Sequence, residues 1–162
     1  MQITIFRRRF TPWGVDGTLV INGVYFTGTV EHPNEFLPAG SYMIALVPIR
    51  FQQGIEKIRT MPTILETKDR VPKKPVLRKP FLKPGFGPFA LKYGSIVIGK
   101  SLKTGLVAYN EEKFQEFCDM ISDASLKKEK VTLVIKDWEK DDIPKEYMVV
   151  LPTNTPANNN LK

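Results

Sequence analysis

The residues best suited to binding chemistry are cations gathered in one segment of the chain. Residues 70–110 contain nine lysines and arginines and no aspartate or glutamate, although the net charge of the whole chain is only +7. Five prolines between residues 72 and 88 remove five backbone donors and favour an extended path outside any sheet. Cationic side chains can spread along this path, which we call the basic loop (residues 70–88). Its cations are Lys73, Lys74, Arg78, Lys79 and Lys83, and Phe81, Phe86 and Phe89 lie between or after them.

This combination of cations and aromatic rings fits several kinds of partner. Single-stranded nucleic acid is bound by cations that neutralise phosphates and by aromatic side chains that stack on bases. A positive loop also docks on an acidic protein or glycan partner, or simply keeps a small protein soluble. The phenylalanines can equally be core residues. Arg7, Arg8 and Arg9 would alternate between the two faces of a strand, so at most two of them can join one basic surface.

The remaining reactive side chains form no complete site. His32 is the only histidine and lies between Glu31 and Glu35. A single imidazole with two carboxylates lacks a fourth metal ligand, so the simplest interpretation of His32 is a turn residue. Cys118 is the only cysteine, which excludes an internal disulfide, and its place in a helical pattern predicts a small buried hydrophobe. Gly85-Phe-Gly87 lacks the Lys-Ser/Thr pair of a phosphate-binding loop. We therefore expect no cofactor and no metal.

The elements that must carry these residues are mostly short strands. Thirteen prolines and eleven glycines in 162 residues imply frequent turns, which suits a β-rich fold. The clearest local signal is a hairpin in which Asn22-Gly23, the favoured pair for a type I′ turn, joins strands at 18–21 and 24–30. Further strands are predicted at 2–10, 41–47, 58–66 with an interruption at Pro62, 93–99 and 131–135, and a weaker one at 147–151.

One helix is predicted over residues 110–124. Asn110 can accept hydrogen bonds from the exposed amides of the first turn, and Glu111 and Glu112 oppose the positive end of the helix dipole. Four residues at positions i, i+3, i+4 and i+7 form an apolar stripe that must lie on the sheet. They are Phe114, Phe117, Cys118 and Ile121.

The predicted fold is therefore mainly β, a compact barrel or sandwich of seven or eight short strands with one packed helix. Residues 1–151 are expected to form a single domain, and residues 152–162, rich in Asn, Thr and Pro, a disordered tail. The first ten residues place an apolar strand before the arginines, the reverse of a signal peptide, and no apolar run is long enough to span a membrane. We expect a cytoplasmic protein without a signal peptide or membrane partner.

Several short motifs in a fixed order resemble a known family. The match covers roughly residues 2–137, and the order of the motifs carries it. The family is a small uncharacterised β-rich domain of Bacteroidota and of phage or prophage genomes, similar in layout to the L,D-transpeptidase catalytic domain. The matching pieces are Gly17-Thr-Leu19, Asn22-Gly23, Pro38-Ala-Gly-Ser-Tyr42, Gly85-Phe-Gly87, Gly94-Ser-Ile-Val-Ile-Gly99 and residues 131–135.

The resemblance also implies where chemistry would lie. The family's distinctive stretch is similar to the histidine base and cysteine nucleophile of transpeptidases. Here the cysteine position is Ser95, and no histidine lies between Phe86 and Tyr93. A serine nucleophile needs a base within hydrogen-bond reach. The resemblance therefore implies a non-catalytic binding or structural module, phage- or prophage-associated, that keeps a transpeptidase-like shell. Single-stranded nucleic-acid binding through the basic loop and a cell-wall peptide enzyme using Ser95 are the alternatives.

Overall fold

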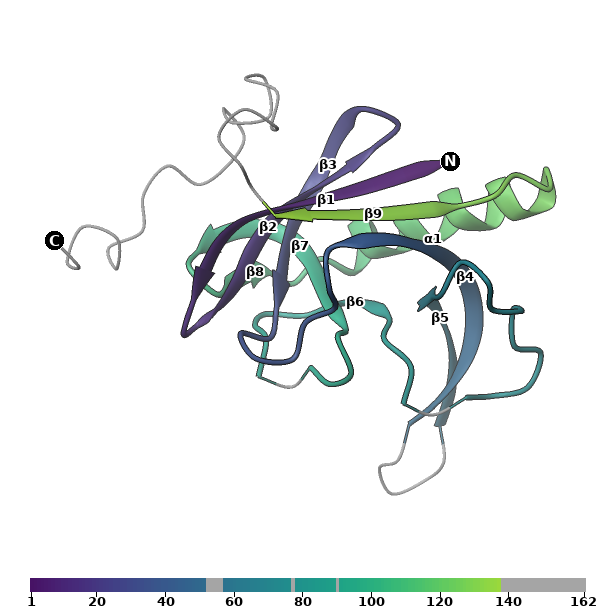
Figure 1. Ribbon diagram of the computed structural model, residues 1–162, viewed down its shortest axis with the longest axis horizontal. Helices are drawn as coiled ribbons and strands as arrows, with labels where there is room; N and C mark the ends of the chain where they lie inside the picture. The colour runs from purple at the N-terminus through teal and green to yellow at the C-terminus, as the bar shows by residue number, and fades with distance from the viewer. Residues whose placement is uncertain (52–56, 77, 90, 138–162) are drawn as a thin grey trace, which may run out of the picture.

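The described part of the chain forms a nearly closed, barrel-like sheet with one helix (Figure 1). The computed structural model describes residues 1–51, 57–76, 78–89 and 91–137. Eight strands follow one another in the order β5-β4-β9-β1-β2-β3-β7-β6, and β8 pairs with β7 beside this path. The prediction of a mainly β fold with one packed helix is confirmed, and the sheet takes the barrel form rather than a sandwich.

The elements have the following bounds. The strands are β1 (Gln2–Thr11), β2 (Gly14–Ile21), β3 (Val24–Glu31), β4 (Gly40–Phe51), β5 (Lys57–Leu65), β6 (Leu82–Pro84), β7 (Ile96–Lys103), β8 (Leu106–Ala108) and β9 (Thr132–Asp137), and the helix α1 is Glu111–Leu126.

The first strand is central to the sheet. β1 pairs antiparallel with β2 and parallel with β9, so Ile5 has Leu19 as its partner on one side and Ile135 on the other. All three residues are at most 1% exposed and belong to the main hydrophobic core. Because side chains alternate along a strand, Ile3, Ile5 and Arg7 form one inward-facing row, and Phe6 faces the other way. Burial of each isoleucine contributes about 1.5–3 kcal/mol.

Two local predictions are confirmed in detail. Asn22 and Gly23 both have positive φ, at 48° and 82°, as a type I′ turn between β2 and β3 requires. Asn110 caps α1, because its side-chain oxygen accepts a hydrogen bond from Lys113 N at 2.9 Å. The helix buries Phe114 and Phe117 in the main core. It packs against β4, β5, β6 and β7, the strands at the two ends of the sheet order, and so covers the place where the barrel closes.

The predicted path of the basic loop is wrong in part. We expected an extended path outside the sheet, but β6 pairs in parallel with β7, from Leu82 beside Ile96 to Pro84 beside Ile98. Proline is tolerated because it ends this short strand, where a missing amide costs little. Upstream, Val76 N donates to Pro48 O at 3.0 Å.

The basic loop therefore joins parts of the barrel. Ile64 N, on β5, donates to Pro80 O at 2.8 Å, and Ile96 N, at the start of β7, donates to Phe81 O at 3.0 Å. Together with Val76, these bonds fix the loop at three points. The segment that was expected to follow an extended path outside the sheet closes the barrel between β5 and β7.

Other strand boundaries also differ from the predictions. The strand expected at 93–99 begins at Ile96, because Tyr93 and Gly94 have φ of 59° and 82° and form a turn. β5 runs through Pro62 without interruption, paired with Leu46. The short strand β8 was not predicted. The strand expected at 147–151 and the tail expected at 152–162 lie outside the described residues. In the described part of the chain, no helix is long and apolar enough to cross a membrane.

Candidate functional site

An open pocket lies between two loops at one end of the barrel. Its volume is about 660 Å³. One wall comes from the loop between β3 and β4, and the other from the segment between β6 and β7. The first wall is His32, Glu35, Phe36 and Leu37, and the second is Phe89, Leu91, Lys92, Tyr93 and Gly94.

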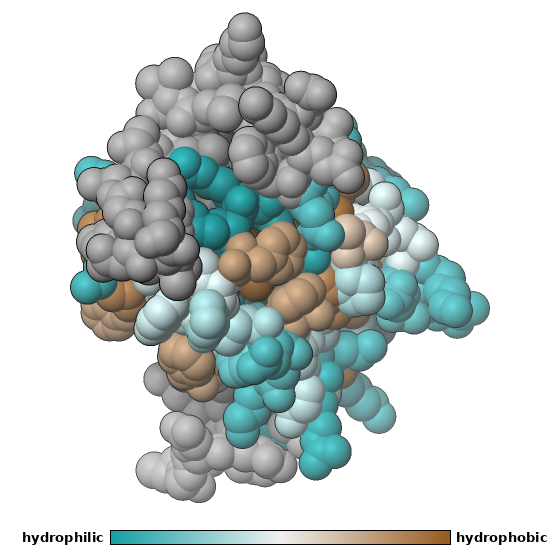
Figure 2. All heavy atoms as spheres, turned by 60° about the vertical axis from the view of Figure 1, so that its left-hand side comes forward, coloured by the Kyte–Doolittle hydropathy of each residue, from teal (hydrophilic) through white to brown (hydrophobic). Residues whose placement is uncertain are grey.

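Phe36, Phe89 and Tyr93 line this pocket with exposed aromatic side chains, and Phe10 and Trp13 are further exposed aromatic residues of the described chain. The ring of Phe36, on the pocket wall, meets the ring of Phe10 edge to face, with centroids 5.7 Å apart. Trp13 lies in the turn between β1 and β2, next to Gly14, whose backbone closely approaches Pro88. Figure 2, which brings the left-hand side of Figure 1 forward, shows apolar surface in the middle of this face. We call these residues the aromatic end, and their exposed fractions are Phe10 50%, Trp13 53%, Phe36 36%, Phe89 68% and Tyr93 49%.

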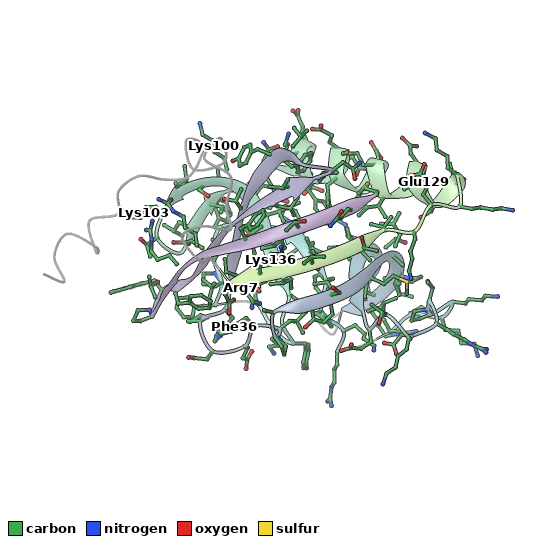
Figure 3. The ribbon with its side chains drawn as sticks, turned by 45° about the horizontal axis from the view of Figure 1, so that its top comes forward. Arg7, Phe36, Lys100, Lys103, Glu129 and Lys136 are labelled. Carbon is green, nitrogen blue, oxygen red and sulfur yellow. The ribbon has the colours of Figure 1, made fainter. Side chains whose placement is uncertain are left out.

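A buried ion pair lies beneath the pocket wall. The side chains of Arg7 and Glu31 are 1% and 0% exposed. Arg7 donates two hydrogen bonds to the Glu31 carboxylate, from Nε at 2.9 Å and from Nη2 at 2.8 Å. Arg7 also lies 3.4 Å from Asp137 Oδ1 and donates to the backbone oxygen of Leu37. Its guanidinium stacks on the ring of Phe36, 4.8 Å from the ring centroid, and the two side chains lie together in Figure 3.

The strand register explains how this pair forms. Arg7 on β1 and Thr29 on β3 both have Gly17 on β2 as their partner, and Glu31 follows Thr29 on the same face. A side chain at Gly17 would clash, because its Cβ would lie 2.6 Å from Thr29 Oγ1. The glycine therefore keeps β2 free of a side chain at the level where Arg7 reaches toward β3.

The electrostatics of the pair follow from its burial. Burial lowers the pKa of the Arg7 guanidinium, but the hydrogen bonds and charge of Glu31, with those of Asp137, outweigh it, so the pKa lies above its usual value. Burial raises the pKa of the Glu31 carboxyl, and Arg7 opposes that rise. Because the bidentate geometry is close to ideal, we regard the pair as ionised at neutral pH.

His32 closes a turn, as its sequence context predicted, and its ring lines the pocket. Its Nδ1 accepts hydrogen bonds from the backbone N–H groups of Asn34 and Glu35, both at 3.1 Å. The neutral imidazole must then carry its proton on Nε2, which makes that nitrogen a donor. The ring also meets Phe89 edge to face at 5.8 Å. His32 therefore offers a hydrogen-bond donor to the pocket, and its basic nitrogen is engaged by the loop.

Ser95 follows the pocket residue Gly94 but does not line the pocket. It is 2% exposed, and its Oγ accepts a hydrogen bond from Phe81 N at 3.2 Å. This bond joins the residue before β7 to the residue before β6, at the closure of the barrel. In the described part of the chain, no hydrogen bond joins Ser95 Oγ to a histidine.

The structure separates the residues predicted for the basic loop. Lys73, Lys74 and Arg78 are exposed, whereas Lys79 lies 3.8 Å from Asp69. Lys83 is half-buried on β6. Two of the three predicted aromatic residues, Phe81 and Phe86, also differ in environment. Phe81 packs against the main core, and Phe86 is 66% exposed and stacks on Tyr109, with ring centroids 5.4 Å apart. Phe81 is therefore not available as a stacking ring beside the exposed cations.

Neither the cysteine nor the acidic residues of the described chain form a reactive or metal-binding site. Cys118 is half-buried on α1 against the main core, and burial raises the pKa of its thiol to about 11. The thiolate is therefore scarce at neutral pH. Among residues 1–51, 57–76, 78–89 and 91–137, no three His, Cys, Asp or Glu side chains are close enough to share a metal ion.

Sequence reasoning missed most of the pocket. Its two walls are more than fifty residues apart in the chain and belong to loops, so no periodicity links them. The sequence does carry one signal. Aromatic residues such as Trp13, Phe36 and Phe89 lie near prolines or glycines in predicted turns, where side chains are often exposed and functional.

Comparisons with known proteins add no assignment. No family model, no curated protein and no solved structure matches the chain. The resemblance drawn from the short motifs therefore stays a prediction.

The position of Ser95 predicts the effect of its removal. Ser95→Ala should lower the free energy of unfolding by about 1 kcal/mol, because it deletes a buried hydrogen bond at the barrel closure. Urea denaturation would measure this, with Ser101→Ala on the following strand, β7, as the control. Incubation of isolated peptidoglycan with both variants would test the enzyme alternative. Loss of peptidoglycan turnover in Ser95→Ala alone, with unchanged stability, would identify Ser95 as a nucleophile.

The buried ion pair makes a second prediction about stability. Arg7→Met should cost about 3–5 kcal/mol of unfolding free energy, because it leaves the Glu31 carboxylate buried without its partner. The double variant Arg7→Met/Glu31→Leu should cost clearly less than the single one, since both charges are then gone. Urea denaturation of the wild type, Arg7→Met, Glu31→Leu and the double variant gives the coupling free energy between the two side chains. Additive costs would contradict a strongly coupled pair.

Proposed function

We propose that the protein is a non-catalytic binding module that holds a partner protein at the aromatic end of the barrel. The observation that carries this proposal is a set of exposed aromatic side chains at one open pocket, where Phe36, Phe89 and Tyr93 line the pocket and Phe10 packs on Phe36. Exposed apolar clusters are uncommon on monomeric proteins unless they serve as interfaces. Aromatic side chains are also the residues that contribute most to binding energy at protein–protein contacts.

The support beneath the pocket favours recognition of a defined shape. Arg7 holds the loop between β3 and β4 through the backbone of Leu37 and the ring of Phe36. His32 holds the start of the same loop through two backbone amides. A loop fixed in this way loses little conformational entropy when a partner binds, which leaves more of the contact energy for affinity.

The reactive groups also support a non-catalytic role. A nucleophile requires a base within hydrogen-bond reach and access to the substrate. Ser95 is buried and bonded to a backbone amide, and the accepting nitrogen of His32 is occupied by its own loop. The phage setting and the transpeptidase-like shell implied by the resemblance remain part of this proposal.

Nucleic-acid binding is the second candidate, and one observation favours it. Lys73, Lys74 and Arg78 are exposed on a loop whose backbone is bonded to the barrel at Val76 and Pro80. Cations on a fixed backbone can follow a phosphate chain. Phe81, however, packs against the core and is not offered as a stacking surface.

Binding at the aromatic end can be tested with a library of random displayed peptides and an array of glycans. We expect selected peptides to bind the wild-type protein and to bind Phe89→Ser about tenfold more weakly, because an exposed aromatic contact is lost. Fluorescence anisotropy of the synthesised peptides gives the affinities. The control is Leu126→Ser, which removes an exposed side chain from the end of α1.

The outcomes of this test are distinct. Peptide binding that Phe89→Ser weakens and Leu126→Ser does not would support the proposal. Peptide binding that Phe89→Ser leaves unchanged would place any interface elsewhere and overturn it. Binding of glycans alone would show that the partner class is wrong.

Nucleic-acid binding predicts submicromolar, salt-sensitive affinity for single-stranded oligonucleotides. Replacement of Lys73 and Lys74 by Gln should weaken that binding and reduce its salt dependence, because fewer phosphates are neutralised. Fluorescence anisotropy with single- and double-stranded oligonucleotides at two salt concentrations measures both effects. The matched control replaces the exposed pair Lys127 and Lys128 by Gln. Weak binding that is equal for both strands and disappears near physiological salt would mean only that the protein is basic.

A further inference from the structure

The floor and the rim of the pocket differ in chemistry. The most buried lining residues are Leu91, which is 3% exposed, and Gly94. Leu37 is half-buried. We call these three residues the floor of the pocket. Among the polar lining groups, Glu35, Lys92 and Tyr93 are exposed and His32 is half-buried. An occupant must therefore bury an apolar group and keep its polar groups near the surface.

The two walls carry opposite charges. Glu35 belongs to the loop between β3 and β4, and Lys92 belongs to the segment between β6 and β7. Both side chains are exposed, and no ion pair joins either of them to another described residue. A chain that crosses the pocket from wall to wall therefore meets a carboxylate on one side and an ammonium group on the other.

We infer that the pocket takes an extended peptide segment of a partner protein. The segment inserts one aromatic or branched aliphatic side chain over Leu37 and Leu91. It carries a basic residue toward Glu35 and an acidic residue toward Lys92. This inference rests on the proposed function and adds to it the chemistry of the partner.

A peptide fits this pocket better than a sugar does. A sugar ring carries hydroxyl groups around its edge, and each one buried without a partner costs about 1–3 kcal/mol. Leu37 and Leu91 offer no hydrogen bonds to such groups. A peptide can instead place a hydrocarbon side chain on the floor and leave its amides at the rim. There the Nε2–H of His32 and the hydroxyl of Tyr93 are available.

Charge reversal on both partners tests this inference. The probes are two synthetic peptides with a central phenylalanine. The first has a lysine before the phenylalanine and a glutamate after it, and the second has these two residues exchanged. Wild-type protein should prefer one charge order by about threefold, the scale of a partly exposed ion pair. The variant Glu35→Lys/Lys92→Glu should prefer the exchanged order by a similar factor. The matched control is Asp123→Lys/Lys100→Glu, which reverses two exposed charges away from the pocket and should keep the wild-type order.

The results separate this inference from the proposed function. A preference that inverts with the pocket variant and not with the control supports both. Equal affinity for the two charge orders, with binding still weakened by Phe89→Ser, overturns the inference and leaves the aromatic interface standing. Peptide affinities that Phe89→Ser does not change overturn both.

Discussion

The pocket depends on one buried ion pair, Arg7 with Glu31. Removing two charges from water costs several kcal/mol per ion, and only excellent geometry repays it. Here the guanidinium meets Glu31 through two hydrogen bonds and finds further acceptors in Asp137 and the backbone of Leu37. An apolar pair of similar volume could fill the same space at no greater cost. It could not bind the carbonyl of Leu37, so the charges give the barrel something that packing alone cannot: a fixed loop above the sheet.

The Arg7–Glu31 pair lies where the inward-facing residues of the sheet change from apolar to polar. Along β1 the inward row runs from Ile3 and Ile5 to Arg7, and across the sheet it passes from Leu133 and Ile135 on β9 to Asp137. The apolar residues form a core that α1 and the closing loop cover. Of the polar residues, Glu31 and Asp137 are the last residues of β3 and β9, and Arg7 reaches both from the middle of β1. The barrel therefore has a closed apolar body and an end whose loops are held from below, which leaves their aromatic side chains exposed.

Features that depend on neighbouring residues could be predicted from the sequence, whereas features that depend on residues distant in the chain could not. The Asn22-Gly23 hairpin and the Asn110 cap depend on neighbouring residues, and both were predicted. The three-residue strands β6 and β8 depend on β7, and their sequences carry no signal of their own. Arg7 was predicted only as one of three arginines of which at most two could join one basic surface, because nothing local reveals that Glu31 lies across β2. The pocket combines loops that only the closed barrel brings together. Ser95 could be singled out by motif, but its hydrogen bond to Phe81 could not.

The energy available at the aromatic end sets what kind of binding it can support. Burying one aromatic side chain contributes about 1.5–3 kcal/mol, and micromolar affinity requires about 8 kcal/mol. Three rings among Phe10, Trp13, Phe36, Phe89 and Tyr93 would provide about 4.5–9 kcal/mol, a range that includes this value, before the entropic costs of association are subtracted. Because Arg7 and His32 have already fixed the loop, a smaller share is lost in ordering it. The charges of Glu35 and Lys92 are too exposed to add much affinity. Their effect lies in orientation, since a segment entering with its charges reversed would meet like charge on both walls.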